Sequence, residues 1–337
     1  MVRQFFKRSG MLAALLAVGI LSSCSDAKNV PAEAKLYIPT NATFNQLLDS
    51  IRPLVKDVKS FEKLAIKKGL KKHFYSGRYT LKAGMTNKEI VQLILTGKQD
   101  EIPVRVGNYA SVLELAGRMA TVFEADSLSI LEAIVAAEHH KGLDTAKMLY
   151  SFIPNTYNFH WNTSGSQFVQ RMKKEYDNFW TEERLALARA ANMTPLEVTT
   201  LASIVQLESA KPDEQPKVAG LYLNRLREGR KLDADPTIVF IKKMQNGFKT
   251  KVSRVYYKDL DIVSPYNTYR NKGLPPGPIC MPNPSAIDAV LRPEQHSYYY
   301  FVADTARPGY HIFAETLSEH ERNANAYRKW ANNNNVR

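Results

Sequence analysis

Cysteine is almost absent from this chain, which has two cysteines, Cys24 and Cys280, among its 337 residues. A disulfide scaffold needs several cysteine pairs, and a cysteine-rich zinc module needs several thiolate ligands. The sequence therefore excludes both, and it predicts a protein that is stabilised by its apolar core alone.

Several common catalytic motifs are also missing. The chain has no P-loop, no dinucleotide-binding glycine fingerprint, no HExxH and no nucleophile elbow. His139 and His140 are adjacent, so they cannot both face one metal ion from one side of a helix. We therefore predict an activity that needs no cofactor and no metal.

Long hydrophobic runs are scarce, and one of them stands near the N-terminus. The basic residues Arg3, Lys7 and Arg8 precede the apolar, uncharged run Met11–Leu21, which is the layout of an export signal. As a helix this run rises roughly 16 Å, about half of the hydrocarbon thickness of a bilayer. It ends in Leu21-Ser22-Ser23-Cys24, which resembles a bacterial lipobox. We predict a leader over residues 1–23, lipidation of Cys24, and a polar tether over residues 24–34; an uncleaved helical anchor is the alternative. Either anchor places the chain outside the cytoplasm, facing the periplasm, at a membrane.

Acidic residues are outnumbered, with 33 Asp and Glu against 46 Lys and Arg and a formal net charge of +13. This balance favours an anionic partner. Eight of the basic residues lie within Arg52–Lys72, beside only Asp57 and Glu62. A solvated helix face explains such a run, and so does a binding surface for an anionic polymer or lipid. Nucleic acid is not expected, because the chain is exported and has no nucleic-acid-binding signature.

The pattern of elements predicts the α+β class and two domains. Residues 35–106 contain strand candidates at Ala34–Ile38, Gly77–Leu81 and Glu101–Val106, with a helix after Thr43 and another after the capping box Thr86–Glu89. Residues 107–330 are richer in helix. There we expect a helix capped by Ser111, another over Ser127–Ala137, an aromatic turn at Phe152–Tyr157, a helix over Gln167–Ala191, a hairpin of Ser297–Ala303 with Tyr310–Ala314, and a helix over Leu317–Trp330.

The sharpest local signal is Thr194-Pro195-Leu196-Glu197, a capping box with proline at the first helical position. From this start, Leu201, Ile204, Val205 and Glu208 fall on one helical face. A carboxyl held against apolar neighbours has a raised pKa, as a general acid for glycoside cleavage requires. The alternative is a glutamate that points into solvent from the helix end.

Further polar candidates follow Glu208. Asp235 begins another helix, where an N-cap is its ordinary role, and Asn224 fits either helix capping or substrate contact. The loop Ser264–Tyr269 offers stacking faces and an amide, as sugar-binding clefts do. The candidate substrate-binding residues are Asn224, Asp235, Tyr266, Asn267, Thr268 and Tyr269.

These segments resemble the endolytic murein transglycosylase family of the YceG-like type. The resemblance covers residues 150–330 and rests on an ordered series of motifs: Phe152-Ile153-Pro154, Leu201–Val205 leading into Glu208, Asn224-Arg225-Leu226, Asp235-Pro236-Thr237, Tyr266–Tyr269, Gly273–Ile279 and Tyr300–Asp304. It implies a membrane-anchored enzyme that cuts within peptidoglycan glycan strands, with a LysM-like module at residues 35–106 and peptidoglycan synthases as possible partners. Glu208 matches the family's catalytic glutamate.

The chain departs from the family pattern at three of these positions. Gln206 replaces an acidic residue and Ser209 replaces threonine, while Asn155 stands where an aspartate is usual. Gln206 leaves Glu208 as the one acid of its segment, and Asn155 removes any role for a carboxylate in that turn.

The resemblance implies a mechanism with one carboxylate that acts twice. Glu208 would protonate the oxygen leaving C1 of N-acetylmuramic acid and then deprotonate the C6 hydroxyl of the same sugar, which leaves a 1,6-anhydro end. Two other readings remain open. One is a hydrolase in which Glu208 is the acid and Asp235 the base for a water, and the other is a non-catalytic scaffold that binds peptidoglycan.

Overall fold

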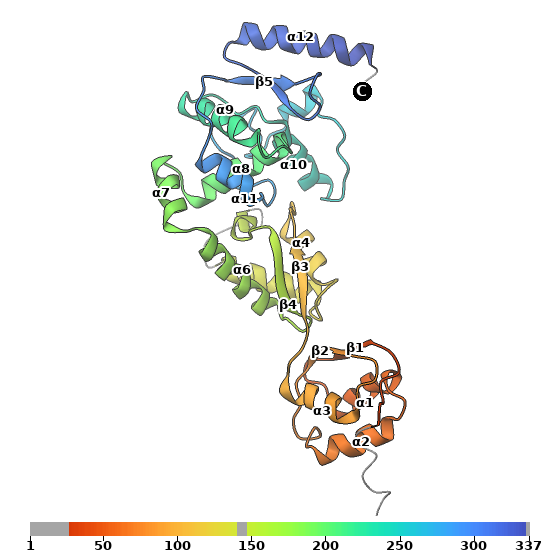
Figure 1. The fold of residues 1–337 in the computed structure, drawn as a ribbon. Coiled ribbons are helices and arrows are strands. Elements are labelled where there is room, and N and C mark those ends of the chain that lie inside the picture. The colour runs from red at the N-terminus through yellow and green to blue at the C-terminus, as the bar shows by residue number, and fades with distance from the viewer. Residues whose placement is uncertain (1–26, 140–146, 335–337) are drawn as a thin grey trace, which may run out of the picture. The chain divides into compact units, whose positions relative to one another are not determined.

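The computed structural model describes residues 27–139 and 147–334 of the chain. Helices and three two-stranded sheets make up this part, which confirms the α+β class (Figure 1). The chain divides into two compact units, residues up to 102 with 158–162, and residues 103–157 with the chain from 163 onward. The predicted leader and Cys24 lie outside the described residues. Within the described part, no helix has the length and apolar character that a membrane crossing requires.

The first unit is built on an antiparallel pair of strands, β1 (Ala34–Ile38) and β2 (Gly77–Leu81), with Leu36 opposite Tyr79. Its helices are α1 (Phe44–Ile51), α2 (Val58–Lys67) and α3 (Asn87–Thr96), with a 3-10 turn, η1, at Arg52–Leu54. The predicted caps are present, since Thr43 and Thr86 each complete a capping box. Inward side chains of both strands and of α1 and α3 form one apolar core, including Leu36, Ile38, Leu47, Leu81, Ile90 and Ile94.

All eight basic residues of the run Arg52–Lys72 are exposed in this unit. They lie on η1 and α2 and on the turns beside them. These elements bury Phe61 and Ala65 instead. The basic face is therefore a solvated surface whose charges are available to a partner.

Strand β3 (Glu101–Val106) pairs with β4 (Asn155–His160), and the division into units falls within both strands. The second unit continues with helices and one hairpin. Its elements are α4 (Val112–Met119), α5 (Ser127–His139), η2 (Lys147–Ser151), α6 (Gly165–Phe179), α7 (Glu182–Ala190), α8 (Pro195–Glu208), α9 (Gln215–Arg227), α10 (Asp235–Asn246), η3 (Tyr257–Asp261), α11 (Pro284–Leu291), β5 (Tyr300–Ala303), β6 (His311–Ala314) and α12 (Leu317–Asn333).

Helix α8 is the centre of the second unit, and α9, α10 and α11 pack around it. Every residue from Val198 to Val205 is buried, so α8 is enclosed on all sides rather than on one stripe. Pro195 and the capping box of Thr194 and Glu197 begin the helix as predicted. A helix held this firmly gives its last residue, Glu208, a fixed position.

Two sequence-based expectations for this unit are wrong. The helix expected over Gln167–Ala191 is two helices, because the chain leaves the helical conformation at Trp180 and Thr181 caps α7. Buried Trp180 packs beside Phe179 and Tyr176, so tertiary packing fixes the break. The turn expected at Phe152–Tyr157 becomes strand from Asn155 onward, because β3 offers a pairing edge that local composition does not reveal.

Candidate active site

The carboxyl group of Glu208 lies at the end of α8 and receives a hydrogen bond from α9. The hydroxyl of Tyr222 donates to Glu208 Oε1 over 2.8 Å. The pKa of Glu208 is raised to about 7, chiefly by burial and also by the nearby Asp235, while the Tyr222 hydrogen bond and Arg225 oppose the rise. Tyr222 is itself buried and its pKa lies well above the ordinary value, so it remains a proton donor at physiological pH. Glu208 can therefore be present both protonated and ionised near neutral pH.

The turn after Glu208 is fixed by a buried polar cluster. Ser209 donates its hydroxyl to Glu214 Oε2 over 2.8 Å, and Gln215 donates its amide to the Ser209 carbonyl over 3.1 Å. Glu214 also accepts from the backbone N–H of His311 over 2.7 Å, which ties the turn to β6. This cluster holds the end of α8 and the start of α9 together, and with them Glu208 and Tyr222.

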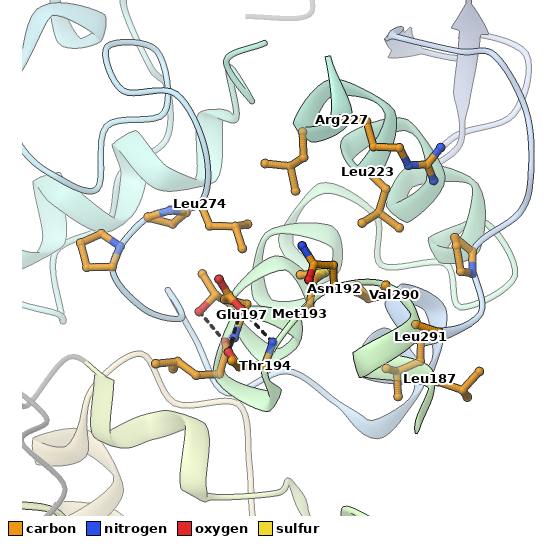
Figure 2. Close-up of a pocket in the computed structure, with 18 of the residues that line it drawn as sticks. Leu187, Asn192, Met193, Thr194, Glu197, Leu223, Arg227, Leu274, Val290 and Leu291 are labelled. Atoms are coloured by element: carbon orange, nitrogen blue, oxygen red, sulfur yellow. Dashed lines mark hydrogen bonds between the residues drawn. The ribbon is translucent and has the colours of Figure 1, made fainter. Parts of the chain in front are cut away.

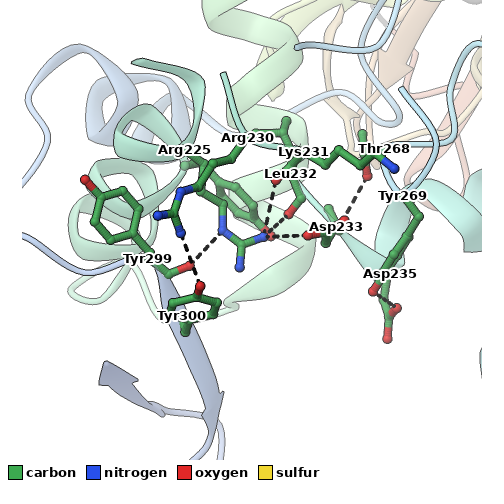
Figure 3. Close-up of polar contacts among 12 residues, drawn as sticks. Arg225, Arg230, Lys231, Leu232, Asp233, Asp235, Thr268, Tyr269, Tyr299 and Tyr300 are labelled. Atoms are coloured by element: carbon green, nitrogen blue, oxygen red, sulfur yellow. Dashed lines mark hydrogen bonds and ion pairs between the residues drawn. The ribbon is translucent and has the colours of Figure 1, made fainter. Parts of the chain in front are cut away.

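Asp235 is not an N-cap, contrary to its ordinary reading in the sequence. The cap position is Ala234, and Asp235 is the first residue of α10. Its carboxylate accepts a hydrogen bond from the hydroxyl of Tyr269 over 2.7 Å (Figure 3). Burial and this hydrogen bond raise the pKa of Tyr269. Asp235 thus faces the site rather than the end of its own helix.

The other residues of the Tyr266–Tyr269 segment are buried and serve the loop itself. Asn267 is fully buried, donates to the carbonyls of Leu260 and Ile262, and accepts from the N–H of Tyr269. Thr268 accepts from the N–H of Ala234 over 3.0 Å and shares a hydrogen bond with Thr237 over 2.9 Å. These contacts fasten the loop to the start of α10, so they place Tyr269 beside Asp235.

Tyr266 packs into the apolar core, with its ring 4.9 Å from that of Phe240. Of the four residues in this segment, Tyr269 alone has its side chain bonded to a carboxylate of the site.

Asn224 and Arg225 bind backbone carbonyl groups. Asn224 donates its amide to the carbonyls of His296 and Tyr298. Arg225 donates to the carbonyls of Tyr299 and Leu232 over 2.7 Å each and lies 3.4 Å from Asp233, as Figure 3 shows. Both side chains link α9 to the segment that precedes β5, and Arg225 also links it to the segment that precedes α10.

Glu208 and Asp235 line one cavity of about 720 Å³. Its wall runs along α10 and includes Val239, Phe240 and Lys243, and on other segments Asn108, Arg254, Cys280 and Tyr327. This volume is in the range of clefts that bind small ligands or parts of a polymer. No cluster of three metal-ligating side chains occurs in the residues that the structure describes.

A larger cavity, of about 1070 Å³, lies elsewhere in the same unit (Figure 2). Leucine, valine, methionine and proline side chains dominate its wall, and none of the candidate residues belongs to it. Its acidic residue is Glu197, whose carboxylate accepts from the N–H and hydroxyl of Thr194. The candidate residues Glu208 and Asp235 therefore belong to the smaller cavity.

Comparison with known proteins agrees with the motifs and the fold. The model of the YceG-like family matches residues 36–326. The chain belongs to the YceG-like family. It is 26% identical over 321 residues to an endolytic murein transglycosylase of Bacillus subtilis (strain 168), covering 89% of this chain and 86% of that protein. It is 29% identical over 170 residues to an endolytic murein transglycosylase of Streptococcus pneumoniae serotype 2, covering 50% of this chain but only 30% of that protein.

The fold is shared with a solved member of the same group. The crystal structure of a putative yceG-like protein from Listeria monocytogenes superposes with a TM-score of 0.57 at 24% identity, covering 86% of this chain and 98% of that one. The family resemblance expected from the sequence is confirmed.

The three residues at which the sequence departs from the expected YceG-like pattern each form hydrogen bonds in the structure. Gln206 accepts from the N–H of Asn283 over 2.6 Å and directs its amide to the Cys280 sulfur at 3.8 Å. Ser209 supplies the hydroxyl of the Glu214 cluster. Asn155 accepts from the N–H of Thr156 at the start of β4. All three substitutions thus take part in local hydrogen bonding.

Sequence reasoning missed the role of Tyr222. It falls on the apolar stripe of α9 with Val218 and Leu221, so periodicity indicates a core residue, and it is buried as that predicts. The hydroxyl group was the one available signal, because a buried tyrosine hydroxyl requires a hydrogen-bond partner. The partner's identity depends on the packing of α8 against α9.

Proposed function

We propose that this protein is an endolytic peptidoglycan lytic transglycosylase that cleaves the glycosidic bond between N-acetylmuramic acid and N-acetylglucosamine within glycan strands. Membership of the YceG-like family and the names of its relatives support this function. The observation that carries the mechanism is Glu208, a carboxyl with a pKa of about 7 at the wall of a cavity. A group that must first donate and then accept a proton works best when its pKa is near the operating pH.

In the first step, protonated Glu208 donates its proton to the oxygen that leaves C1 of N-acetylmuramic acid. The bond from C1 to this oxygen breaks, and positive charge develops on the sugar. Asp235 lines the same cavity, and its negative charge favours this transition state. Tyr269 holds the Asp235 carboxylate through its hydroxyl.

In the second step, the Glu208 carboxylate accepts the proton of the C6 hydroxyl of the same sugar, and that oxygen attacks C1. A 1,6-anhydro ring forms and Glu208 regains its proton, so no water is consumed. Attack within one molecule has a proximity advantage over attack by a free water. Tyr222 orients the carboxylate for both transfers through its bond to Oε1.

The remaining candidates act on the shape of the cleft in this proposal. Tyr266, Asn267 and Thr268 are buried and hold the loop, and Asn224 is tied to two carbonyls. Direct contact with sugar falls to Asp235 and the other residues that line the cavity. Tyr269 acts on the site through its hydrogen bond to Asp235.

Product analysis tests the reaction directly. Purified glycan strands are digested, and the new ends are identified by mass spectrometry. Anhydro ends in the wild-type digest that disappear with Glu208→Gln support the transglycosylase. Reducing ends, heavier by one water, would instead identify a hydrolase. The shared cavity of Glu208 and Asp235 makes that the second candidate, with Asp235 activating the water.

The N-terminal part of the chain is proposed to hold the enzyme at its substrate. Residues 35–106 would act as a LysM-like module, and Cys24 would carry a lipid that anchors the protein to a membrane, facing the periplasm and beside peptidoglycan synthases. Cys24→Ser tests the anchor by fractionation. Release of a folded, active protein supports lipidation, and unchanged membrane binding with the leader attached identifies a helical anchor.

A further inference from the structure

Helix α10 carries opposite charges at its two ends on the face that lines the active-site cavity. Asp235, Pro236, Val239, Phe240 and Lys243 all belong to the cavity wall, which places them on one face of the helix. Asp235 is in the first turn and Lys243 in the last. Lys243 is eight positions after Asp235 in the sequence, so the two residues lie about 12 Å apart along the helix axis. The cavity is therefore acidic where the chemistry occurs and basic further along.

The ammonium group of Lys243 is not committed to a carboxylate. Its neighbour Lys242 forms an ion pair with Asp259 over 2.7 Å, whereas Lys243 takes part in no ion pair within the described residues. Lys243 lies close enough to the buried Cys280 to counteract the rise of that thiol's pKa, which burial raises to about 12. Lys243 and Cys280 both line this cavity.

A second basic residue, Arg254, lines this cavity from the segment between α10 and η3. Its guanidinium lies 5.7 Å from the centre of the Tyr256 ring, and it too is in no ion pair within the described residues. Two basic side chains from different segments thus line one cavity. A neutral sugar would not require them, whereas a carboxylate would be bound by charge-assisted hydrogen bonds.

We propose that Lys243 and Arg254 form a subsite for a carboxylate carried by the glycan strand, about one disaccharide away from the bond that is cleaved. This inference rests on the proposed function, and it adds that the enzyme selects strands by an acidic substituent. Peptidoglycan offers two sources of that group. One is the stem peptide, and the other is the lactyl carboxylate of a muramic acid from which the peptide has been removed.

The test measures binding with the full chain carrying Glu208→Gln, which prevents turnover. Lys243→Gln, Arg254→Gln and the double variant are compared with Lys249→Gln, an exposed lysine outside the cavity wall. The ligands are peptide-bearing strands, strands stripped of peptide by an amidase, and a neutral chitooligosaccharide. Each single variant is expected to weaken binding of carboxylate-bearing strands about three- to tenfold at low salt, and the double variant more. The loss should shrink at high salt.

Binding of the chitooligosaccharide should not change in any variant. Loss of binding to peptide-bearing strands alone identifies the stem peptide as the source, and loss on stripped strands alone identifies the lactyl group. Equal binding by the Glu208→Gln protein with and without the two further substitutions would overturn the subsite, and so would an equal loss on the neutral ligand. A wild type that makes no product from any strand would refute the proposed function, while this binding comparison would still decide the subsite.

Discussion

At the residue scale, the site depends on how Glu208 is solvated. Its carboxyl has lost water to the surrounding protein, and the hydrogen bond from the Tyr222 hydroxyl partly replaces that water. This arrangement leaves the group close to its pKa at neutral pH. The loss of water destabilises the ionised carboxylate, so the folded protein is less stable when Glu208 is ionised.

Glu208→Gln should therefore reduce product formation by about 10²- to 10⁴-fold, the usual contribution of general acid–base catalysis. Because its pKa in the folded state is about 7, against an ordinary 4.5, wild type should lose stability as pH rises between these values. The melting temperature of Glu208→Gln should exceed that of wild type by a margin that grows over this interval and is constant above it. Melting curves across pH and an assay for anhydro ends check both parts.

Glu197→Gln is the matched control, because Glu197 lies on the same helix and glutamine preserves the capping box. It should change neither activity nor the pH dependence of melting. If Glu208→Gln retained most of its activity and melted several degrees lower, Glu208 would be a structural residue.

Tyr222→Phe should shift the pH profile while leaving the fold in place. Without the donated hydrogen bond the Glu208 carboxylate is less stable, so the pKa of Glu208 rises. The alkaline limb of kcat/KM should move upward by about one pH unit, and kcat should fall, since the carboxyl is no longer oriented. Tyr257→Phe, at a side chain that is 90% exposed, is the control and should leave the profile unchanged. If the alkaline limb of kcat/KM were not shifted in Tyr222→Phe, Tyr222 would contribute only packing to the site.

At the scale of elements, the candidate site is formed by the end of α8, the middle of α9, the start of α10 and the Tyr266–Tyr269 loop. Each of these is fixed by hydrogen bonds that lie away from the cavity. Thr268 is the joint between the loop and α10.

Thr268→Val should test this joint. The substitution removes the buried acceptor of the Ala234 N–H and leaves Thr237 without its hydroxyl partner, which should destabilise the protein by about 1–3 kcal/mol. Because Asp235 follows Ala234 directly, kcat should fall as well. Thr268→Ser keeps the hydroxyl and should retain both properties. Unfolding by denaturant measures the stability of both variants, and product assays measure their kcat. If Thr268→Val and Thr268→Ser gave the same values, Thr268 would not be the joint between the loop and α10.

At the scale of the whole molecule, charge and chemistry belong to different units. The basic run Arg52–Lys72 is exposed on the first unit, and Glu208 and Asp235 belong to the second. In the proposed function, the first unit attracts the anionic polymer and the second unit cuts it.

Reversal of charge at Lys63, Lys67 and Lys71 to glutamate should weaken binding to intact sacculi at low salt and have little effect near 1 M salt, where charges are screened beyond about 3 Å. Activity on short glycans should remain, because these residues are outside the cavity. The control is a second triple variant in which Arg322, Arg328 and Lys329 are replaced by glutamate. These residues are exposed on α12, so this variant has the same change of net charge on a different surface. Equal losses in both triple variants would mean that net charge, rather than this face, binds the polymer.

The sequence by itself determined the elements whose signals are local. The N-cap Thr43, the capping boxes of Thr86 and Thr194, the strands β1 and β2, and the hairpin of β5 and β6 all lie where the pattern predicts them. Each depends on contacts within a few residues or on simple alternation. The motif order also indicated the family, and the apolar stripe of α8 indicated a raised pKa for Glu208.

Tertiary structure alone decided the partners. Tyr222 reaches Glu208 across 14 residues of sequence, and Tyr269 reaches Asp235 across 34. The break at Trp180 and the strand β4 likewise depend on neighbours that are distant in the chain. Local propensity and periodicity describe what one segment prefers, whereas a carboxyl's donor, its solvation and the charge opposite it are set by which segments pack together. The sequence therefore indicates which glutamate to consider, and the packing of α8 against α9 and α10 raises its pKa.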